Sequence, residues 1–488
     1  MAAVAAPVGG GRTDRAPAGP GGRPRPGLRG PSAATAAGLG LALVALVLGL
    51  RPLSDNSFLT HVATGRLLLD GGVPTADPYT FTAAGHPWVV QSWLASLGYG
   101  VVDRLAGGTG LLLLNGLLCA ALTGLVWRLT RPAGALAGRA LVGALVVGMG
   151  ASAWLERPFL MAIVLLAVAL VAAEGGLRPG WLVPVGWVWV NVHGSFPLGL
   201  VAVALLAAGR RLDGDRPATE VRAGAALAAG MLLGALNPLG PRLLWFPVLL
   251  LGRSDVLRHV AEWQPPTFAY TWQWLFLALA AVAALGALRG RSWRVALPTA
   301  AFTGLALLSA RNLAVAAVVL VPGAAAALRV DGRTGEGRSP RTALAAAGIV
   351  AVAAVALVAA AGRPAFSFDR YPVAALAWAG ERGLLAPEAR LVAPDTVGNY
   401  RELTEGAHAA VFLDDRYDLF PREVLDDYLV LVHGGPGWEG VLDRWGAGAV
   451  VWPRSLPLAG LLDSSPSWRV AWDDVAWVVA VPQSSIAA

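Results

Sequence analysis

Long runs of apolar residues alternate with short polar or arginine-bearing segments along about three quarters of the chain. Each run is long enough to form a helix, and several approach the ~20 residues that a bilayer-crossing helix prefers. The pattern therefore predicts eleven spans, with ends defined to within a few residues. Pro184 and Pro197 interrupt the region 181–209. The runs lie at 34–50, 109–127, 140–155, 159–173, 181–193, 195–209, 223–239, 272–288, 295–309, 313–328 and 342–361.

The pattern changes at both ends of the chain. Residues 1–33 are mostly Gly, Pro, Ala and Arg, which predicts a disordered cytoplasmic tail. Residues 362–488 alternate short β-rich runs with helical stretches at 422–432 and 438–445, which predicts a small α/β domain with a mixed sheet. The expected strands are 390–393, 409–413, 449–452, 468–472 and 476–481. Residues 34–361 form the predicted membrane domain, and 51–108 form its long first outer loop.

Composition supports a membrane protein. Hydrophobic residues make up 56% of the 488 residues and charged residues only 14%, against about 25% charged in ordinary soluble domains. A soluble chain of this size would have too little polar surface to cover its core. The composition therefore excludes a soluble enzyme or a wholly disordered chain, and the single Cys119 excludes an internal disulfide.

The distribution of arginine predicts the orientation. Every basic residue is Arg, and the net charge is +7. With the N-terminus inside, the cytoplasmic segments hold more than twice as many arginines as the outer loops of the membrane domain. We therefore expect a multi-pass protein of the cell membrane, with a cytoplasmic N-terminus and an extracytoplasmic C-terminal domain. Membrane topology explains the net charge, so no nucleic-acid partner is expected.

Candidate chemistry begins in the first outer loop. Residues 57–70 have the pattern of a helix lying in the membrane interface, with Asp55 and His61 near its start. Asp77 precedes Pro78 and could simply cap a turn. Ionisable groups at membrane depth are costly, so a cluster of them at one membrane face indicates a site, whereas isolated ones only keep a loop hydrated.

Three further motifs lie at outer ends of spans. Arg157 lies between Glu156 and Pro158, where a local ion pair is the simpler account, and Arg311 precedes Asn312 in a similar position. Asn191 and His193 end one span, where they could line a cavity or only hydrogen-bond between helices. The third motif is Asn237–Gly240 followed by Glu262–Pro266, in which Asn-Pro and Gly could only stop a helix. The arginine fork can donate two hydrogen bonds to a lipid phosphate, which makes Arg157 and Arg311 candidate phosphate ligands.

These motifs, in this order, resemble a known family. The order comprises the Asp- and His-bearing first loop, Gly71–Thr82, Gly85–Trp88, Arg157-Pro158, Trp189–Gly194, Asn237–Gly240 and Glu262–Pro265, followed by 399–419 in the tail. It resembles bacterial multispan proteins of the GT-C glycosyltransferase superfamily, of the protein-mannosyltransferase-like kind. The resemblance covers most of the chain and supports a GT-C-like fold better than it supports a reaction.

The resemblance implies a specific chemistry. GT-C enzymes transfer a sugar from a polyprenyl-phosphate donor and carry a catalytic carboxylate in the first outer loop, where this chain has Asp55. Asp77 would be the second carboxylate of that loop, with His61 supporting it. Relatives often carry another acid where this chain has Ser57, and a hard cation prefers several carboxylates. We therefore expect no obligatory metal or other cofactor. The alternative is a site that binds a divalent cation.

The expected substrate contacts extend across the chain. Arg157, Arg311 and Glu262 are expected near the donor, with Asn191 and His193 lining the same cavity. The acidic segment 414–418 follows an apolar run, at a place where loops of α/β domains bind ligands. Asp415 and Arg416 are therefore expected to face the membrane domain and hold an acceptor, or else to pair only on the surface.

Two other functions compete with a transferase. A transporter or flippase of lipid-linked substrates would place ionisable groups near the middle of the membrane, whereas here they gather at one face. A non-catalytic envelope scaffold would fit the departure at Ser57. The expected partners in every case are membrane lipids, and for the transferase a polyprenyl-phosphate sugar that serves as a substrate.

Overall fold

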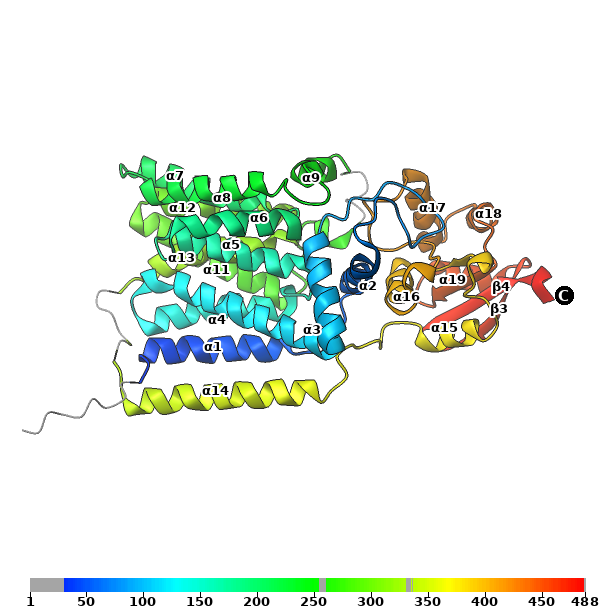
Figure 1. Cartoon of the computed structure of the whole chain (residues 1–488), viewed down its shortest axis with the longest axis horizontal. Helices are drawn as coiled ribbons and strands as arrows, with labels where there is room; N and C mark the ends of the chain where they lie inside the picture. Colours follow the sequence, from blue (N-terminus) through cyan, green and yellow to red (C-terminus); the bar gives the residue numbers. More distant parts are fainter. Residues whose placement is uncertain (1–29, 254–259, 331–334, 336, 487–488) are drawn as a thin grey trace, which may run out of the picture.

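The computed structural model describes residues 30–253, 260–330, 335 and 337–486. A bundle of roughly parallel and antiparallel helices forms one part, and a smaller part that contains all the described strands lies against one end of the bundle (Figure 1). The predicted disordered tail, 1–33, falls almost wholly outside the described residues. Ser32 is described, and its hydroxyl accepts a hydrogen bond from the Thr35 N–H to cap the first helix.

Each of the eleven apolar runs coincides with a helix. These helices are α1 (Ala33–Gly49), the second half of α3 (Trp93–Leu129), α4 (Leu136–Ala153), α5 (Pro158–Ala173), α6 (Leu182–Val192), α7 (Pro197–Leu212), α8 (Ala218–Leu233), α11 (Thr271–Gly290), α12 (Trp293–Leu308), α13 (Asn312–Ala327) and α14 (Pro340–Ala361). A short helix, α9 (Arg242–Leu251), contains Pro247 and does not coincide with any of the predicted runs.

Only some of these helices have the length of a membrane span. Within the described residues, four helical segments are long and apolar enough to cross a membrane: Trp93–Ala133, Leu136–Ala153, Thr271–Gly290 and Pro340–Ala361. The count of eleven spans therefore stays a prediction. The outermost helix, α14, buries only Ala360 and exposes large apolar side chains such as Leu344 and Val358, as a surface in contact with lipid does.

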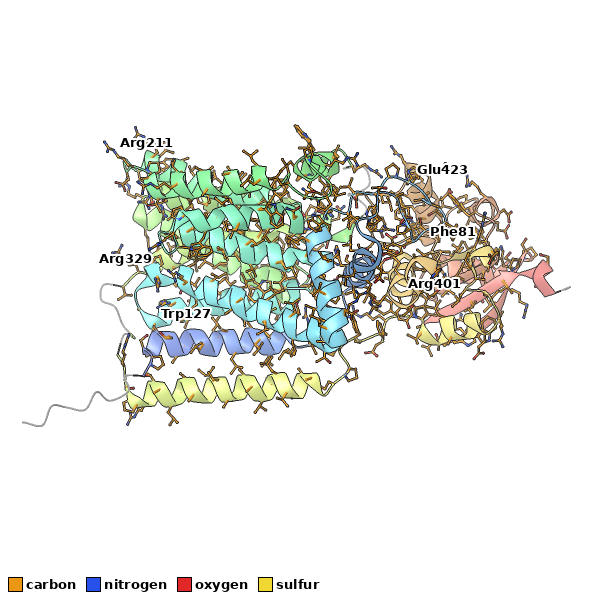
Figure 2. The ribbon with its side chains drawn as sticks, in the orientation of Figure 1. Phe81, Trp127, Arg211, Arg329, Arg401 and Glu423 are labelled. Carbon is orange, nitrogen blue, oxygen red and sulfur yellow. The ribbon has the colours of Figure 1, made fainter. Side chains whose placement is uncertain are left out.

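The two ends of the bundle differ in their side chains. Arg211, Arg329 and Trp127 lie at the end remote from the C-terminal part, whereas Phe81, Arg401 and Glu423 lie in or beside the C-terminal part (Figure 2). Arg211 and Arg329, which the arginine count assigns to the cytoplasm, thus lie at the same end of the bundle. Which end faces the cytoplasm stays a prediction.

The first outer loop is largely helical. It contains α2 (Asn56–Gly71), which matches the predicted interfacial helix, and the first half of α3. Gly107 has φ 58° and ψ −159°, so it breaks α3 and turns the first half across the end of the bundle (Figure 1). The predicted end of the loop, at residue 108, lies at this break.

Two glycines allow α2 and the first half of α3 to touch through their backbones. A Cβ at Gly65 would lie 2.1 Å from the Ser96 carbonyl oxygen, and one at Gly100 would lie 2.4 Å from the Gly65 carbonyl oxygen. Both clashes are with backbone atoms, which cannot rotate away.

We expect Gly65→Ala to lower the free energy of unfolding by about 1–3 kcal/mol, because α2 must move away from α3 to make room for the methyl group. Thermal unfolding in detergent measures the effect. Gly71→Ala is the matched control on the same helix, since its Cβ would meet nothing within 4 Å. Equal melting temperatures for the two variants would contradict the close packing.

The C-terminal part contains a four-stranded mixed sheet in the order β1-β2-β4-β3. β1 (Leu391–Val392) runs parallel to β2 (Ala449–Pro453), whereas β4 (Trp477–Pro482) is antiparallel to both β2 and β3 (Trp468–Asp473). The small α/β domain with a mixed sheet is therefore confirmed. The helices of this part are α15 (Val373–Gly380), α16 (Asp395–Glu405), α17 (Arg422–His433), α18 (Trp438–Arg444) and α19 (Pro457–Ser464).

Helices cover both faces of the sheet. Ala449 and Val451 of β2 pack with α15 and α16, whereas Val450 and Trp452 belong to the core that includes α17, α18 and α19. Successive residues of a strand point to opposite faces, so a strand buried on both sides is apolar throughout. This explains why the sequence of β2 is a continuous apolar run.

Extended segments join the C-terminal part to the first outer loop. Val411 N–H donates to the Tyr79 carbonyl at 2.9 Å, and Phe81 N–H donates to the Val411 carbonyl at 3.0 Å. Leu53 pairs in the same way with Phe366. The prediction of a sheet strand at 409–413 is wrong: Val411 is extended, but it bridges to Thr80 of the first outer loop instead of joining the sheet.

Candidate active site

The start of α2 positions the first carboxylate. Asp55 is the N-cap of this helix, and its Oδ1 accepts a hydrogen bond from the Phe58 N–H at 3.2 Å. The chain just before it is held by Glu156, whose Oε1 accepts from the Ser54 N–H at 2.6 Å and from the Asp55 N–H at 2.8 Å. The Asp55 side chain is thus fixed by both its own helix and the turn before α5.

A row of alternating charges begins at Asp55. Arg157 donates from Nε to Asp55 Oδ1 at 2.7 Å and from Nη1 to Glu262 Oε2 at 2.8 Å. Glu262 Oε1 in turn accepts from Arg311 Nη1 at 2.8 Å. We call these four residues, Asp55, Arg157, Glu262 and Arg311, the outer charge network. They come from four segments that lie far apart in the sequence.

The backbone holds the far end of this network in place. Glu262 belongs to the short helix η3 (Ala261–Trp263), and its carbonyl accepts from the Arg311 N–H at 3.0 Å and from the Ser309 hydroxyl at 3.1 Å. The Arg311 guanidinium lies over the rings of Phe159 and Trp263, at 5.1 and 5.3 Å. The turn between α12 and α13 therefore fixes both partners.

Some side-chain polar atoms of the outer charge network remain available to a ligand. Among the described residues, Asp55 Oδ2, Arg157 Nη2 and Arg311 Nε have no hydrogen-bond partner. The Arg157 and Arg311 side chains are each 23% exposed, so a ligand can reach this part of the molecule. A free carboxylate oxygen near two free guanidinium edges offers one proton acceptor and a binding place for an anion.

The two predicted histidines lie beside the network. His61 Nδ1 is 2.9 Å from Ser96 Oγ, and His193 Nε2 is 3.0 Å from Arg311 Nη2. Burial, with a contribution from the Arg157 charge, lowers the pKa of His61 to about 3, so its imidazole is neutral at neutral pH. His193 Nδ1 accepts from the Ser195 N–H at 3.0 Å, and the Arg311 guanidinium beside the ring disfavours an imidazolium there.

The Asn191 side chain hydrogen-bonds between two helices. Its Oδ1 accepts from Trp93 Nε1 at 2.8 Å, its Nδ2 donates to the Trp187 carbonyl at 2.8 Å, and the residue is fully buried. The side-chain amide therefore connects the start of α3 to α6. This geometry favours the interhelical role over the predicted cavity lining.

Asp415 reaches the network from the C-terminal part. Ser57 Oγ donates to Asp415 Oδ2, and Asn399 Nδ2 donates to Oδ1 at 2.7 Å. Burial raises the pKa of Asp415 to about 7, since it outweighs the hydrogen bond from Ser57 and the favourable charge of Arg157. Asp415 therefore carries a proton in part of the molecules at neutral pH. Ser57 supplies the contact that holds this carboxyl at the start of α2.

Asp77 and Arg416 form a different cluster. Arg416 Nη2 donates to Asp77 Oδ1 at 2.6 Å and to Asp414 Oδ2 at 2.5 Å, and its guanidinium lies 4.3 Å from the centre of the Trp88 ring. Asp77 also accepts from the N–H groups of Tyr79 and Thr80, so it caps a turn. The structure does not bring Asp77 to Asp55, and its geometry favours a structural role over the predicted catalytic one.

Sequence reasoning missed two contributors to the site. Glu156 was expected to pair locally with Arg157, but it binds the backbone in front of Asp55 instead. Asn399 holds Asp415 from α16, and it also donates to the Asn56 carbonyl at 3.1 Å. Within the described residues, no group of three or more His, Cys, Asp or Glu side chains is placed to hold a metal ion.

No protein-family model and no curated protein matches this chain. Solved structures of the oligosaccharyltransferase of Archaeoglobus fulgidus are similar to it. The apo form matches with a TM-score of 0.51 at 12% identity, over 85% of this chain and 69% of that one. The form tethered to an acceptor peptide with the NVT sequon matches with a TM-score of 0.50 at 13% identity, over 86% and 69%.

The chain has a GT-C-like fold. The likeness covers most of the chain, as the motif resemblance does. At this identity it supports the fold and not a particular substrate.

Proposed function

We propose that this GT-C-like protein is a membrane glycosyltransferase that takes a sugar from a polyprenyl-phosphate donor. The observation that carries the proposal is the free Oδ2 of Asp55, held beside the free guanidinium edges of Arg157 and Arg311. Glycosyl transfer needs both features: a base for the acceptor and positive charge for the departing phosphate.

In the proposed reaction, the acceptor hydroxyl oxygen attacks the anomeric carbon of the donor sugar. A new carbon–oxygen bond forms while the bond from that carbon to the lipid phosphate breaks, and the phosphate leaves with the bonding electrons. Asp55 Oδ2 takes the hydroxyl proton. Arg157 and Arg311 stabilise the charge of the departing phosphate, and Glu262 holds the two guanidinium groups at a fixed spacing.

The C-terminal part is proposed to complete the acceptor side. Asp415 lies against Ser57 in the first turn of α2, close enough to Arg157 for the two charges to interact. We propose that an acceptor bound at Asp55 also contacts Asp415. The archaeal enzyme has been solved with a tethered acceptor peptide. For this chain we propose an acceptor in the cell envelope.

The phosphate assignment predicts that Arg157→Lys and Arg311→Lys each weaken donor binding by about tenfold or more, because lysine keeps the charge but loses the two-pronged geometry. Competition by polyprenyl phosphate in mixed micelles measures this affinity. Arg104→Lys is the matched control, since Arg104 lies in the first outer loop and pairs with Asp70 on the exposed surface. Unchanged affinity in both test variants would leave the phosphate without its proposed ligands, and would favour a scaffold or transporter.

A further inference from the structure

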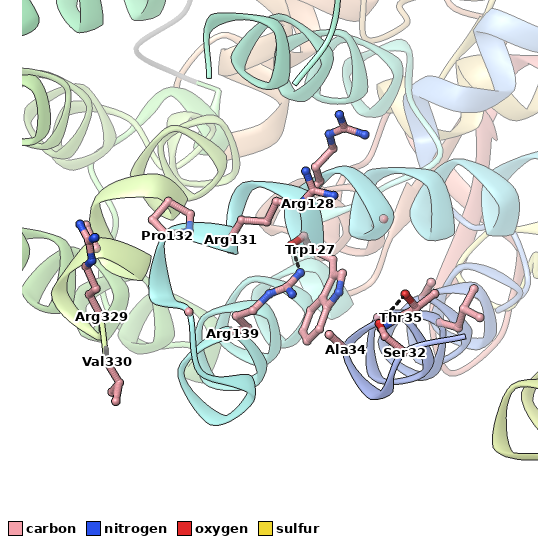
Figure 3. Close-up of a pocket in the computed structure, with 16 residues that line it drawn as sticks. Ser32, Ala34, Thr35, Trp127, Arg128, Arg131, Pro132, Arg139, Arg329 and Val330 are labelled. Carbon is pink, nitrogen blue, oxygen red and sulfur yellow. Dashed lines mark hydrogen bonds between the residues drawn. The ribbon is translucent and has the colours of Figure 1, made fainter. Parts of the chain in front are cut away.

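His61 in α2 has one ring nitrogen bound by the protein and one left open. Nδ1 lies 2.9 Å from the hydroxyl oxygen of Ser96, in the first half of α3. Nε2 has no hydrogen-bond partner among the described residues, and the residue is partly exposed. His61 does not line the cavity shown in Figure 3, which lies at the other end of the bundle, around Trp127 and Arg329. The proposed transfer step makes no use of the open nitrogen.

The Ser96 hydroxyl determines which nitrogen carries the ring proton. Ser96 is fully buried, and among the described residues His61 Nδ1 is the only partner of its hydroxyl. A buried hydroxyl proton needs an acceptor, so Ser96 donates to Nδ1. If Nδ1 carried the ring proton instead, the hydroxyl proton would be left without an acceptor. We therefore assign the proton of the neutral ring to Nε2.

The His61 ring serves as a hydrogen-bond donor and not as a base. Burial, with a contribution from the Arg157 charge, lowers the pKa of His61 to about 3, so the ring is uncharged at neutral pH. Nδ1 is occupied by the Ser96 hydroxyl and Nε2 already carries a proton, which leaves no free lone pair to accept another one. The open position therefore offers a neutral N–H group to a ligand.

This N–H group lies in the same part of the molecule as the outer charge network. His61 follows Asp55 by less than two turns of α2. The Arg157 charge acts on its ring, and the ring is close enough to His193 for their charges to interact. His193 in turn lies 3.0 Å from Arg311. A ligand bound to the two arginines thus lies next to His61.

We propose that His61 donates a hydrogen bond from Nε2 to an oxygen of the sugar that the lipid donor carries, and that Ser96 is the positioning residue that keeps the proton on Nε2. This inference rests on the proposed function. A neutral N–H matches an uncharged hydroxyl or ring oxygen, whereas the charged guanidinium groups form the stronger bonds with phosphate. A sugar without that oxygen would leave the N–H unpaired, so the contact contributes to the choice of sugar.

The tautomer is tested without any substrate. The full chain, with its six histidines labelled with ¹⁵N and reconstituted in lipid, gives imidazole shifts that distinguish the two tautomers. We expect His61 to carry its proton on Nε2 and not to titrate between about pH 5 and 8, and we expect Ser96→Ala to move its Nδ1 signal. His433 is the internal control, because its Nδ1 lies 2.8 Å from the Leu429 carbonyl, which only accepts, so its neutral ring has the opposite tautomer. A proton on Nδ1 of His61, or titration in this range, would overturn the proposal.

The same spectrum tests the ligand. We expect the Nε2 signal of His61 to move with at least one of a set of polyprenyl-phosphate hexoses and pentoses, and to stay in place with polyprenyl phosphate alone. A signal that moves with polyprenyl phosphate alone would make the ring a phosphate ligand. A signal that no sugar-bearing lipid moves would remove the sugar contact. Either result overturns the proposal.

Two substitutions separate this contact from the proposed function. Glutamine can place an amide N–H near the position of Nε2, whereas asparagine is too short. We expect His61→Asn to lower kcat/KM for the donor by about 10- to 100-fold, His61→Gln to restore most of it, and neither to change the affinity for polyprenyl phosphate. His86→Asn, on an exposed turn of the same loop, is the matched control. Equal losses in both His61 variants, or a loss of affinity for polyprenyl phosphate, contradict the sugar contact. Normal transfer by Asp55→Asn would instead defeat the proposed function and leave the measured tautomer unchanged.

Discussion

Asp55→Asn is expected to lower the rate of sugar transfer by about 10²- to 10⁴-fold, the range that positioned proton transfer contributes in enzymes. Asparagine is also a good N-cap, so α2 should still begin at this residue. Arg157 keeps its second partner, Glu262, and should remain in place. The variant therefore removes the proton acceptor while leaving the helix and the neighbouring guanidinium. Transfer from a polyprenyl-phosphate sugar, measured in reconstituted vesicles, gives the rate.

Asp70→Asn is the matched control for this substitution. Asp70 lies on the same helix, and its side chain is 67% exposed. Among the described residues it pairs only with Arg104, whose side chain is 57% exposed. We expect normal transfer from this control. Near-normal transfer by Asp55→Asn, with the control also active, would show that Asp55 is not the base.

Arg416→Met is expected to lower the free energy of unfolding by about 3–5 kcal/mol, because it leaves buried carboxyl groups without their cation. Asp77, Asp414 and Glu402 have fully buried side chains around this arginine. Burial and the nearby Asp414 charge already raise the pKa of Glu402 well above its ordinary value. Thermal unfolding measures the loss. Limited proteolysis should show the C-terminal part detaching from the first outer loop.

The control for this prediction is Arg444→Met in α18. Arg444 is half exposed and pairs with Asp427, so its loss should cost at most about 1 kcal/mol. Adding Asp77→Asn to Arg416→Met should restore part of the stability, since it removes one uncompensated charge. A melting temperature for Arg416→Met as high as that of the control would contradict the structural role of the cluster.

The bundle and the sheet could largely be predicted from the sequence. Apolar runs form helices because a backbone surrounded by apolar groups must satisfy its own hydrogen bonds. The runs that contain β2, β3 and β4 are short, bounded and rich in Val and Trp, which favours strands. The run at 409–413 has the same character, but pairing depends on which neighbour lies opposite. Nothing local in the sequence indicates that Thr80 takes that place.

The residues of the candidate site could be predicted from the sequence, but the contacts between them could not. Asp55, Arg157, Glu262 and Arg311 were each expected at the outer face, but their sequence separations say nothing about which pairs form. Asp77 illustrates the difficulty: a carboxylate before Pro78 serves equally well as a turn cap or as an acid. The buried Arg416 decides between these roles, and it lies more than three hundred residues away in the chain.

The most direct test of the proposed active site is a structure of the protein with polyprenyl phosphate bound. We predict that the phosphate lies against the free edges of Arg157 and Arg311, with the unpaired Oδ2 of Asp55 facing the position of the transferred sugar. Both arginines should keep Glu262 as their shared partner. A phosphate bound away from both arginines, with Asp55 covered by protein, would contradict the account.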